Sequence, residues 1–169
     1  MSTIRIIDIT DRHGRVIEPE WLARAEVVHR QLRPQLPEAY AAKMQRVFDD
    51  GARMSIATTE REVVGVAVFR IHENTFDGVQ MYVDDLVAEE AQRSRGIGKA
   101  LLRHLEDAAR GAGCAKLNLD SGTQRQQAHR FYFREGMLVT SFHFAKPLQP
   151  ADRHSASRLE TPAATDVPL

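Results

Sequence analysis

The sequence predicts an α/β fold built on a mixed, mostly antiparallel sheet, with one parallel β-α-β crossover and helices on both faces. Three strand-like segments follow one another at 54–59, 63–71 and 79–88, and strands so closely spaced tend to pair as antiparallel neighbours. An amphipathic helix at 96–112 then leads into a short strand at 116–120. A strand, a helix and a second strand in this order imply a right-handed parallel crossover.

The length of 169 residues predicts one folded domain, which we place at 1–147. Residues 148–169 are polar, rich in proline and without periodicity, so we expect a disordered C-terminal tail. Lys plus Arg and Asp plus Glu each number 23, and a net charge of zero argues against a dedicated nucleic-acid binder. The single cysteine, Cys114, excludes an internal disulfide and favours a cytoplasmic location. No apolar run approaches the roughly 18 residues of a membrane span.

The first third of the chain predicts one strand and two helices. Thr3–Ile9 is rich in β-branched residues, which favour a strand. Pro19 suits the first turn of a helix, and the segment up to Arg33 carries apolar residues at helical spacing. A second helix is predicted over 38–50, with Gly51 as its C-terminal stop.

The strand at 79–88 contains a change of phase. Val79 and Val83 share one face, but Asp85 stands where the alternation calls for another apolar residue, and apolar residues resume at Leu86 and Val87. A β-bulge explains such a slip, and bulges often lie beside active sites. A strand that ends near residue 84 explains it equally well, so both interpretations stay open.

The remaining elements follow from apolar stripes and glycine stops. Leucine and alanine residues form one stripe along 96–112, and Gly113 ends that helix. A further helix is predicted over 124–135, with Gly136 as its cap. Residues 137–146 are strand-like in composition.

The turn before the helix at 96–112 has the features of an anion-binding site. Glycines there let the backbone approach a ligand, and the helix start offers unpaired amides and a positive dipole end. A Walker motif does not fit, because Gly98-Lys99 is followed by Ala100 where the motif needs Ser or Thr. A dinucleotide fingerprint does not fit either, because Leu101 stands where its third glycine is needed. An Arg-x-x-Gly-x-Gly diphosphate turn does fit. We expect its contacts to come from seven consecutive residues: Arg93, Ser94, Arg95, Gly96, Ile97, Gly98 and Lys99.

With this turn, two further runs occur in a familiar order and spacing: Asp84-Asp85-Leu86-Val87, and Ala128 to Tyr132 followed by Gly136-Met137. On these motifs the span 82–137 resembles the GCN5-related N-acetyltransferase (GNAT) superfamily. Ser94 replaces the first of three glycines common in the family's turn, and Arg125 stands where the family often has Asn.

The resemblance implies a cofactor, acetyl-CoA, and roles for individual residues. The pantetheine arm would pair with the backbone of three residues in the strand: Leu86, Val87 and Ala88. Tyr132 would act as general acid, since a phenol is protonated at neutral pH. Asp84 is the expected base and Asp85 the expected anchor of the amine. No metal is expected, because the histidines and the cysteine lack zinc-site spacing.

The function predicted from these motifs is transfer of an acetyl group to a primary amine of a small molecule. Two alternatives stay open: acetylation of a protein lysine or N-terminus, and a non-catalytic module that senses acyl-CoA. Small-molecule or peptide amines are therefore the expected partners, without nucleic acid or membrane, and a homodimer is left open.

Overall fold

The computed structural model describes residues 3–60, 62–92 and 95–148. The chain divides into two compact units, Met1–Met137 and Leu138–Leu169. Arg93 and Ser94, both predicted to bind the diphosphate, lie outside the described residues. So does the predicted tail apart from Leu148.

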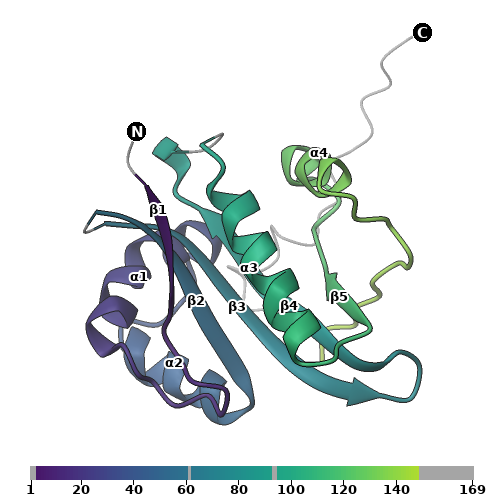
Figure 1. Cartoon of the computed structure of the whole chain (residues 1–169), viewed down its shortest axis with the longest axis horizontal. Coiled ribbons are helices and arrows are strands. Elements are labelled where there is room, and N and C mark those ends of the chain that lie inside the picture. The colour runs from purple at the N-terminus through teal and green to yellow at the C-terminus, as the bar shows by residue number, and fades with distance from the viewer. Residues whose placement is uncertain (1–2, 61, 93–94, 149–169) are drawn as a thin grey trace, which may run out of the picture. The chain divides into compact units, whose positions relative to one another are not determined.

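The first unit contains a single five-stranded sheet in the order β1-β2-β3-β4-β5 (Figure 1). The three pairings from β1 to β4 are antiparallel, and β4 pairs with β5 in parallel through the crossover helix. The predicted fold class is therefore confirmed. The strands are β1 (Ile4–Asp8), β2 (Ala52–Thr59), β3 (Glu62–Asn74), β4 (Gly78–Ala88) and β5 (Lys116–Leu119).

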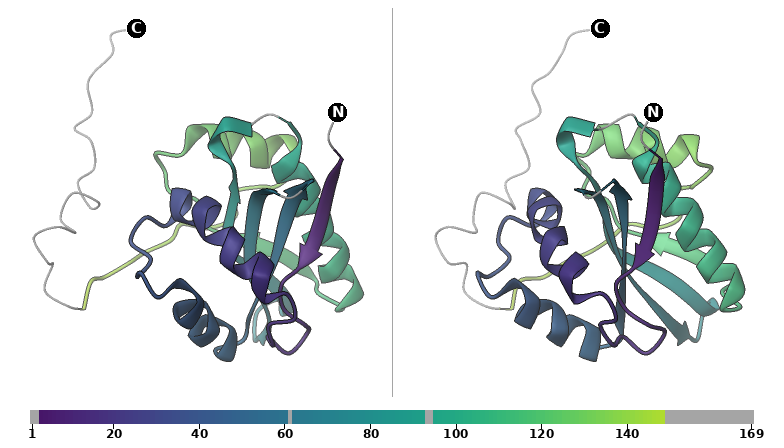
Figure 2. Two further views of the ribbon diagram at one scale, coloured as in Figure 1. Left: turned by 90° about the vertical axis from the view of Figure 1, so that its left-hand side faces the viewer. Right: turned by 60° about the vertical axis from the view of Figure 1, so that its left-hand side comes forward.

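Helices cover both faces of this sheet, as predicted (Figure 2). On one face, α1 and α2 bury residues such as Val28, Met44 and Phe48 in one apolar cluster. On the other, α3 buries Leu101 and Leu105 in a second cluster. The helices are α1 (Pro19–Leu32), α2 (Tyr40–Asp49), the short 3-10 helix η1 (Glu90–Gln92), α3 (Ile97–Gly111) and α4 (Gln126–Arg134).

A β-bulge interrupts β4 where the sequence changes phase. Val68 of β3 lies opposite Asp85 while the next residue, Phe69, lies opposite Val83, so Asp84 is the extra residue. The bulge is thus confirmed, and the alternative of a strand ending near residue 84 is wrong because β4 continues to Ala88.

The bulge exchanges the two faces of β4. Before it, Val83 packs in the cluster under α3, and beyond it Val87 packs in the cluster under α1 and α2. Because side chains alternate along a strand, the extra residue leaves Asp84 and Asp85 both on the face of α1 and α2. A regular strand would have pointed them to opposite faces.

The parallel pair opens beyond the bulge. β5 pairs with β4 only along Gln80–Val83, whereas β4 runs on to Ala88 with β3 on its other side. Among the described residues, no strand pairs with the outer edge of β4 over 84–88. Leu86, Val87 and Ala88, predicted to pair with the pantetheine arm, stand along this open edge.

One predicted element is absent. Residues 137–146 have the alternating composition of a strand, yet residues 137–148 adopt no helix or strand. A strand needs a partner whose backbone completes its hydrogen bonds, and these residues pair with none in the described part of the chain. Their composition reports a preference for extended backbone, not a pairing.

Candidate active site

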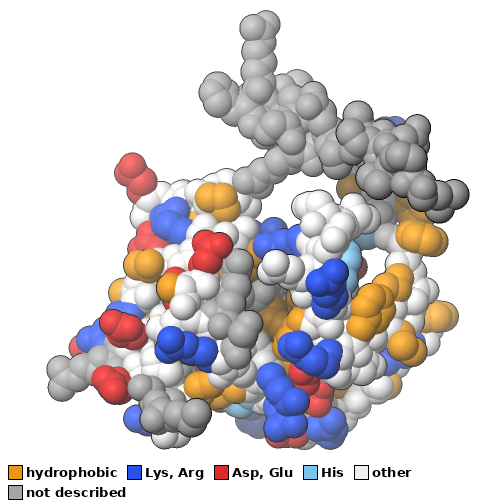
Figure 3. Space-filling view, turned by 90° about the horizontal axis from the view of Figure 1, so that it is seen from above, with side chains coloured by type: hydrophobic (Ala, Val, Ile, Leu, Met, Phe, Trp, Pro, Cys, Tyr) orange, Lys and Arg blue, Asp and Glu red, His pale blue; other side chains and the backbone are white. Residues whose placement is uncertain are grey.

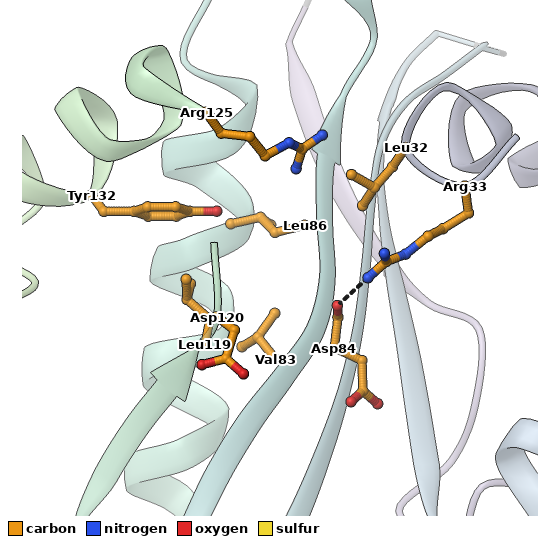
Figure 4. Close-up of a pocket in the computed structure, with 9 residues that line it drawn as sticks. All are labelled: Leu32, Arg33, Val83, Asp84, Leu86, Leu119, Asp120, Arg125 and Tyr132. Atoms are coloured by element: carbon orange, nitrogen blue, oxygen red, sulfur yellow. Dashed lines mark hydrogen bonds between the residues drawn. The ribbon is translucent and has the colours of Figure 1, made fainter. Parts of the chain in front are cut away.

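A pocket lies where β4 and β5 part, beside the start of α4 (Figure 4). It draws residues from α1, both strands and α4, which are far apart in the sequence. Its lining consists of Leu32, Arg33, Val83, Asp84, Leu86, Leu119, Asp120, Arg125 and Tyr132.

Tyr132 reaches this pocket from α4, and its hydroxyl points toward Leu86 (Figure 4). The preceding residue, Phe131, fixes the helix against α3: a Cβ built on Gly98 would lie 3.3 Å from the Phe131 ring. Burial raises the pKa of Tyr132 above its ordinary value, although the charge of Arg125 opposes the shift. The hydroxyl is therefore protonated at neutral pH and able to donate a proton.

Asp85 is held by two residues from the end of α1. Its Oδ2 lies 2.9 Å from Nε2 of His29, and its Oδ1 accepts a hydrogen bond of 2.6 Å from Nε of Arg33. With His29 Nε2 donating to the carboxylate, His29 Nδ1 accepts from the Tyr40 hydroxyl, 2.9 Å away. Burial raises the pKa of Asp85, but His29 and Arg33 outweigh it and hold that pKa below its usual value.

The backbone carbonyl and the side-chain carboxylate of Asp84 bind different arginines. Its backbone carbonyl accepts a hydrogen bond of 3.1 Å from Nη2 of Arg33 at the pocket (Figure 4). Its carboxylate Oδ2 accepts from Nε of Arg70 at 2.8 Å, and Arg70 also donates to Asp50 at the end of α2. The carboxylate thus belongs to a chain of ion pairs along the sheet face.

The catalytic and substrate roles predicted from the sequence stay predictions. The structure brings Tyr132 and Asp84 to one pocket, whereas both carboxylate oxygens of Asp85 are engaged by His29 and Arg33. This arrangement suits a residue that positions Arg33.

Two arginines line the pocket without a clear signal in the sequence. Arg33 stands at the end of a predicted helix, and only its place just before Pro34 marks it. Arg125 stands where the family often has Asn. The structure places both guanidinium groups on the pocket wall.

The predicted anion-binding turn forms the start of α3. Gly96 is the N-cap, with φ of 84° in the left-handed region, and α3 begins at Ile97 as its buried first residue. A Cβ built on Gly96 would meet no atom within 4 Å, so the described residues leave space beside the first residue of the turn. Lys99 Nζ lies 3.6 Å from Glu135 beyond α4, and Arg95 is exposed.

An open strand edge and an open helix start are what a CoA molecule would require. The edge of β4 over 84–88 offers backbone hydrogen-bonding groups to the amides of a pantetheine arm. The amides at the start of α3 suit a diphosphate. The described residues therefore fit the group that the sequence predicts.

The view from above looks onto the end of the sheet where β4 and β5 part (Figure 3). It is hollowed near its middle, and Lys and Arg side chains lie beside the hollow. Among the described residues no three His, Cys, Asp or Glu side chains gather as a metal site would need, and no helix is long and apolar enough to cross a membrane.

The β4 edge, the α3 start and the Tyr132 hydroxyl together suit transfer of an acyl group from a thioester carrier, so the fold and the site define an acyltransferase. Residues 20–137 match the family described as Acetyltransferase (GNAT) family. The chain belongs to this family; it is an N-acetyltransferase, and acetyl-CoA is its co-substrate.

Similar proteins agree with this membership. An uncharacterized N-acetyltransferase of Bacillus subtilis strain 168, YhdJ, is 33% identical over 134 residues, which cover 76% of this chain and 92% of that protein. The aminoalkylphosphonate N-acetyltransferase of Salmonella typhimurium is 32% identical over 115 residues, or 66% of this chain and 71% of that protein. The aminoglycoside N-acetyltransferase AAC(6')-Iy, solved with CoA, has the same fold: its TM-score is 0.73 at 17% identity, over 87% of this chain and 95% of that one.

Proposed function

We propose that this N-acetyltransferase acts on the primary amine of a small molecule. The observation that carries the proposal is the pocket at the β4–β5 opening, where the Tyr132 hydroxyl faces Leu86 on the open strand edge. The pocket is small and partly open to solvent, which supports a compact acceptor.

Binding of the co-substrate is assigned to the open edge of β4 and to the α3 start. Acetyl-CoA supplies an acetyl group activated as a thioester. We place its pantetheine arm along Leu86, Val87 and Ala88, and its diphosphate at the amides of Gly96 to Lys99. Positive charge from Arg93, Arg95 and Lys99 would favour the same diphosphate.

Two proton transfers accompany the reaction. A free amine has a pKa near 10.4, so it arrives as ammonium and must lose a proton before it can attack a carbonyl carbon. Asp84, a residue of the pocket lining, is the proposed acceptor of that proton; a water molecule would have to carry the proton to its carboxylate, which also pairs with Arg70. Tyr132 is the proposed donor of a proton to the departing thiolate. For Asp85, the contacts with His29 and Arg33 support a positioning role over the predicted amine anchor.

Each alternative function predicts a different observation. Acetylation of a protein lysine or N-terminus needs a long groove for a peptide, and the small pocket supports a small amine instead. The relatives named above for small substrates, aminoalkylphosphonates and aminoglycosides, also support a small amine. A sensor without catalysis would bind acetyl-CoA and release no thiol with any amine.

Replacement of Tyr132 tests the proposal. We expect Tyr132→Phe to lower kcat by about 10²–10⁴, the usual contribution of a general acid, with little change in affinity for CoA. Thiol release from acetyl-CoA over a panel of polyamines, amino acids, aminophosphonates, aminoglycosides and peptides measures turnover, and calorimetry measures CoA affinity.

Tyr82→Phe provides the matched control. Its hydroxyl donates to Asp120 at the edge of the pocket, so its loss should lower kcat by no more than about tenfold, the worth of one hydrogen bond. Equal kcat in Tyr132→Phe and the parent enzyme would remove Tyr132 from the mechanism. Turnover confined to peptides would show that the acceptor is a protein.

A further inference from the structure

We infer that the acceptor is a small zwitterion: an amine whose other end carries an anionic group such as a phosphonate or carboxylate, bound between Arg33 and Arg125. This inference rests on the proposed function and names the substrate class of the same pocket. It follows from where the pocket places its charged side chains and what holds each of them.

Arg33 is a cation fixed in place. Nε donates to the Asp85 carboxylate at 2.6 Å and Nη2 donates to the Asp84 carbonyl at 3.1 Å. Asp85 is itself anchored by His29, whose side chain is 2% exposed. These contacts, the ones described for Arg33, use two of its five N–H donors. With 44% of its side chain exposed, Arg33 can offer the others to a ligand.

Arg125 reaches the pocket from the opposite side (Figure 4). It is the N-cap residue of α4, so its guanidinium and the free amides of the first helical turn share one region of positive potential. The backbone is fixed there because the Arg125 amide donates to the Gly122 carbonyl at 2.9 Å. The same carbonyl accepts a hydrogen bond of 3.0 Å from His129 Nε2.

Two residues of the pocket lining, Asp84 and Asp120, direct their carboxylates to other partners than these arginines. The Asp84 carboxylate turns toward Arg70. Asp120, at the end of β5, accepts from the Tyr82 hydroxyl and lies on the other side of Leu86 from Arg125 (Figure 4). Cationic and anionic groups thus occupy opposite ends of the pocket, with the Tyr132 hydroxyl between them.

A zwitterion matches this order. An anionic end between two guanidinium groups makes paired, charge-assisted hydrogen bonds. The ammonium end then points toward the Asp120 carboxylate and lies beside Tyr132, the proposed proton donor. A polycation of the same size would place an ammonium group against Arg33 or Arg125 and meet repulsion.

Three amines of similar length test the inference on the full-length enzyme with acetyl-CoA. They are 2-aminoethylphosphonate, whose anionic end is tetrahedral; β-alanine, whose anionic end is planar; and 3,3-dimethylbutylamine, whose end opposite the amine is an uncharged tert-butyl group shaped like the phosphonate. We expect kcat/KM for one or both of the first two amines, called the anionic amines below for that end, to exceed that of 3,3-dimethylbutylamine by about 10- to 150-fold, the worth of hydrogen bonds to a charged group.

Substitution of the arginines gives the second comparison. Arg125→Gln should lower kcat/KM for the anionic amines by about 10- to 150-fold more than that for 3,3-dimethylbutylamine, with little change in the KM of acetyl-CoA. Arg33→Lys keeps the positive charge beside Asp85 but loses the planar guanidinium that can donate two parallel hydrogen bonds. It should also lower kcat/KM for the anionic amines. Arg130→Gln removes an exposed arginine of the same helix, outside the pocket lining, and should change none of these values. Calorimetry with 2-aminoethylphosphonate and CoA should show the same order of affinities.

The outcomes separate the two proposals. Equal kcat/KM for the anionic amines and 3,3-dimethylbutylamine would overturn the inference and leave the proposed function standing. So would an Arg125→Gln variant that loses activity equally toward all three, or mainly through the KM of acetyl-CoA, since Arg125 would then serve the co-substrate. Absence of turnover with every amine of the wider panel would overturn the proposed function, and this inference with it.

Discussion

Asp84 and Asp85 show how one inserted residue determines what two neighbouring side chains can do. The bulge leaves both on the face of α1 and α2, where Arg70 takes the carboxylate of Asp84 and Arg33 takes that of Asp85. The Asp84 backbone carbonyl meanwhile turns to the pocket and orients Arg33. In this way the acidic pair holds the Arg33 guanidinium in place at the pocket.

A second charged pair, Asp8 and His104, joins β1 to α3. Nε2 of His104 lies 2.9 Å from Oδ1 of Asp8. Its hydrogen bond with Asp8 raises the pKa of His104, and the same hydrogen bond lowers the pKa of Asp8. The raised pKa stabilises the fold at pH values below about 6.5, and this contribution is lost as pH rises through the folded-state pKa of His104. The lowered pKa contributes above about 3.9 and is lost as pH falls.

A double-mutant cycle should therefore find coupling between Asp8 and His104 that depends on pH. We expect about 0.5–1 kcal/mol at pH 5.5, as for other partly exposed pairs, and less at pH 8.5. Urea unfolding of the parent, Asp8→Asn, His104→Asn and the double variant at both pH values gives the coupling free energy. Coupling that grows toward pH 8.5 would contradict the assignment.

At the scale of elements, the sequence pattern predicted the features that depend on neighbouring residues alone. The apolar stripe at 96–112 became α3 over 97–111, and the phase slip at Asp85 became the bulge. The strand expected at 137–146 failed because pairing depends on a partner that composition does not reveal. The partners of Asp84 and Asp85 were hidden for the same reason: Arg70, Arg33 and His29 lie 14, 52 and 56 residues from them in sequence.

The contact between β3 and α3 depends on the lack of a side chain at Gly65. A Cβ built on Gly65 would lie 2.7 Å from Cγ2 of Ile97 and 2.8 Å from Cδ1 of Leu101. Both residues belong to the first turns of α3 and are buried, so an alanine at 65 has to push the helix start outward. We expect Gly65→Ala to lower the free energy of unfolding by about 1–3 kcal/mol and to weaken CoA binding, because the shifted amides are those assigned to the diphosphate.

Gly111→Ala provides the control for that substitution. Gly111 is the last residue of the same helix, and a Cβ there would meet no atom within 4 Å. Its replacement should raise stability by about 0.4–1 kcal/mol and leave CoA affinity unchanged. Chemical denaturation and calorimetry distinguish the two variants. A Gly65→Ala protein as stable as the parent would show that α3 is not packed as tightly as the contacts require.

At the scale of the whole first unit, the site joins segments that the chain keeps far apart. The end of α1, the bulge of β4, the end of β5 and helix α4 all line its pocket. None of these segments holds the pocket alone, so the site exists only when the sheet is complete. A ligand bound across them must therefore stabilise the cooperative fold and not one element of it.

Thermal unfolding with CoA tests this dependence. A ligand present at 100 times its Kd and bound only to the folded state adds about 2.7 kcal/mol. For a protein of this size each kcal/mol raises Tm by about 2–4 °C, so we expect a rise of about 5–10 °C. Pantetheine, which lacks the diphosphate, should give a smaller rise at equal concentration. In Gly96→Ala the backbone at φ of 84° is strained by a side chain, and the response to CoA should fall toward that of pantetheine. If CoA leaves the Tm of the folded parent unchanged, the open strand edge and the α3 start do not bind it.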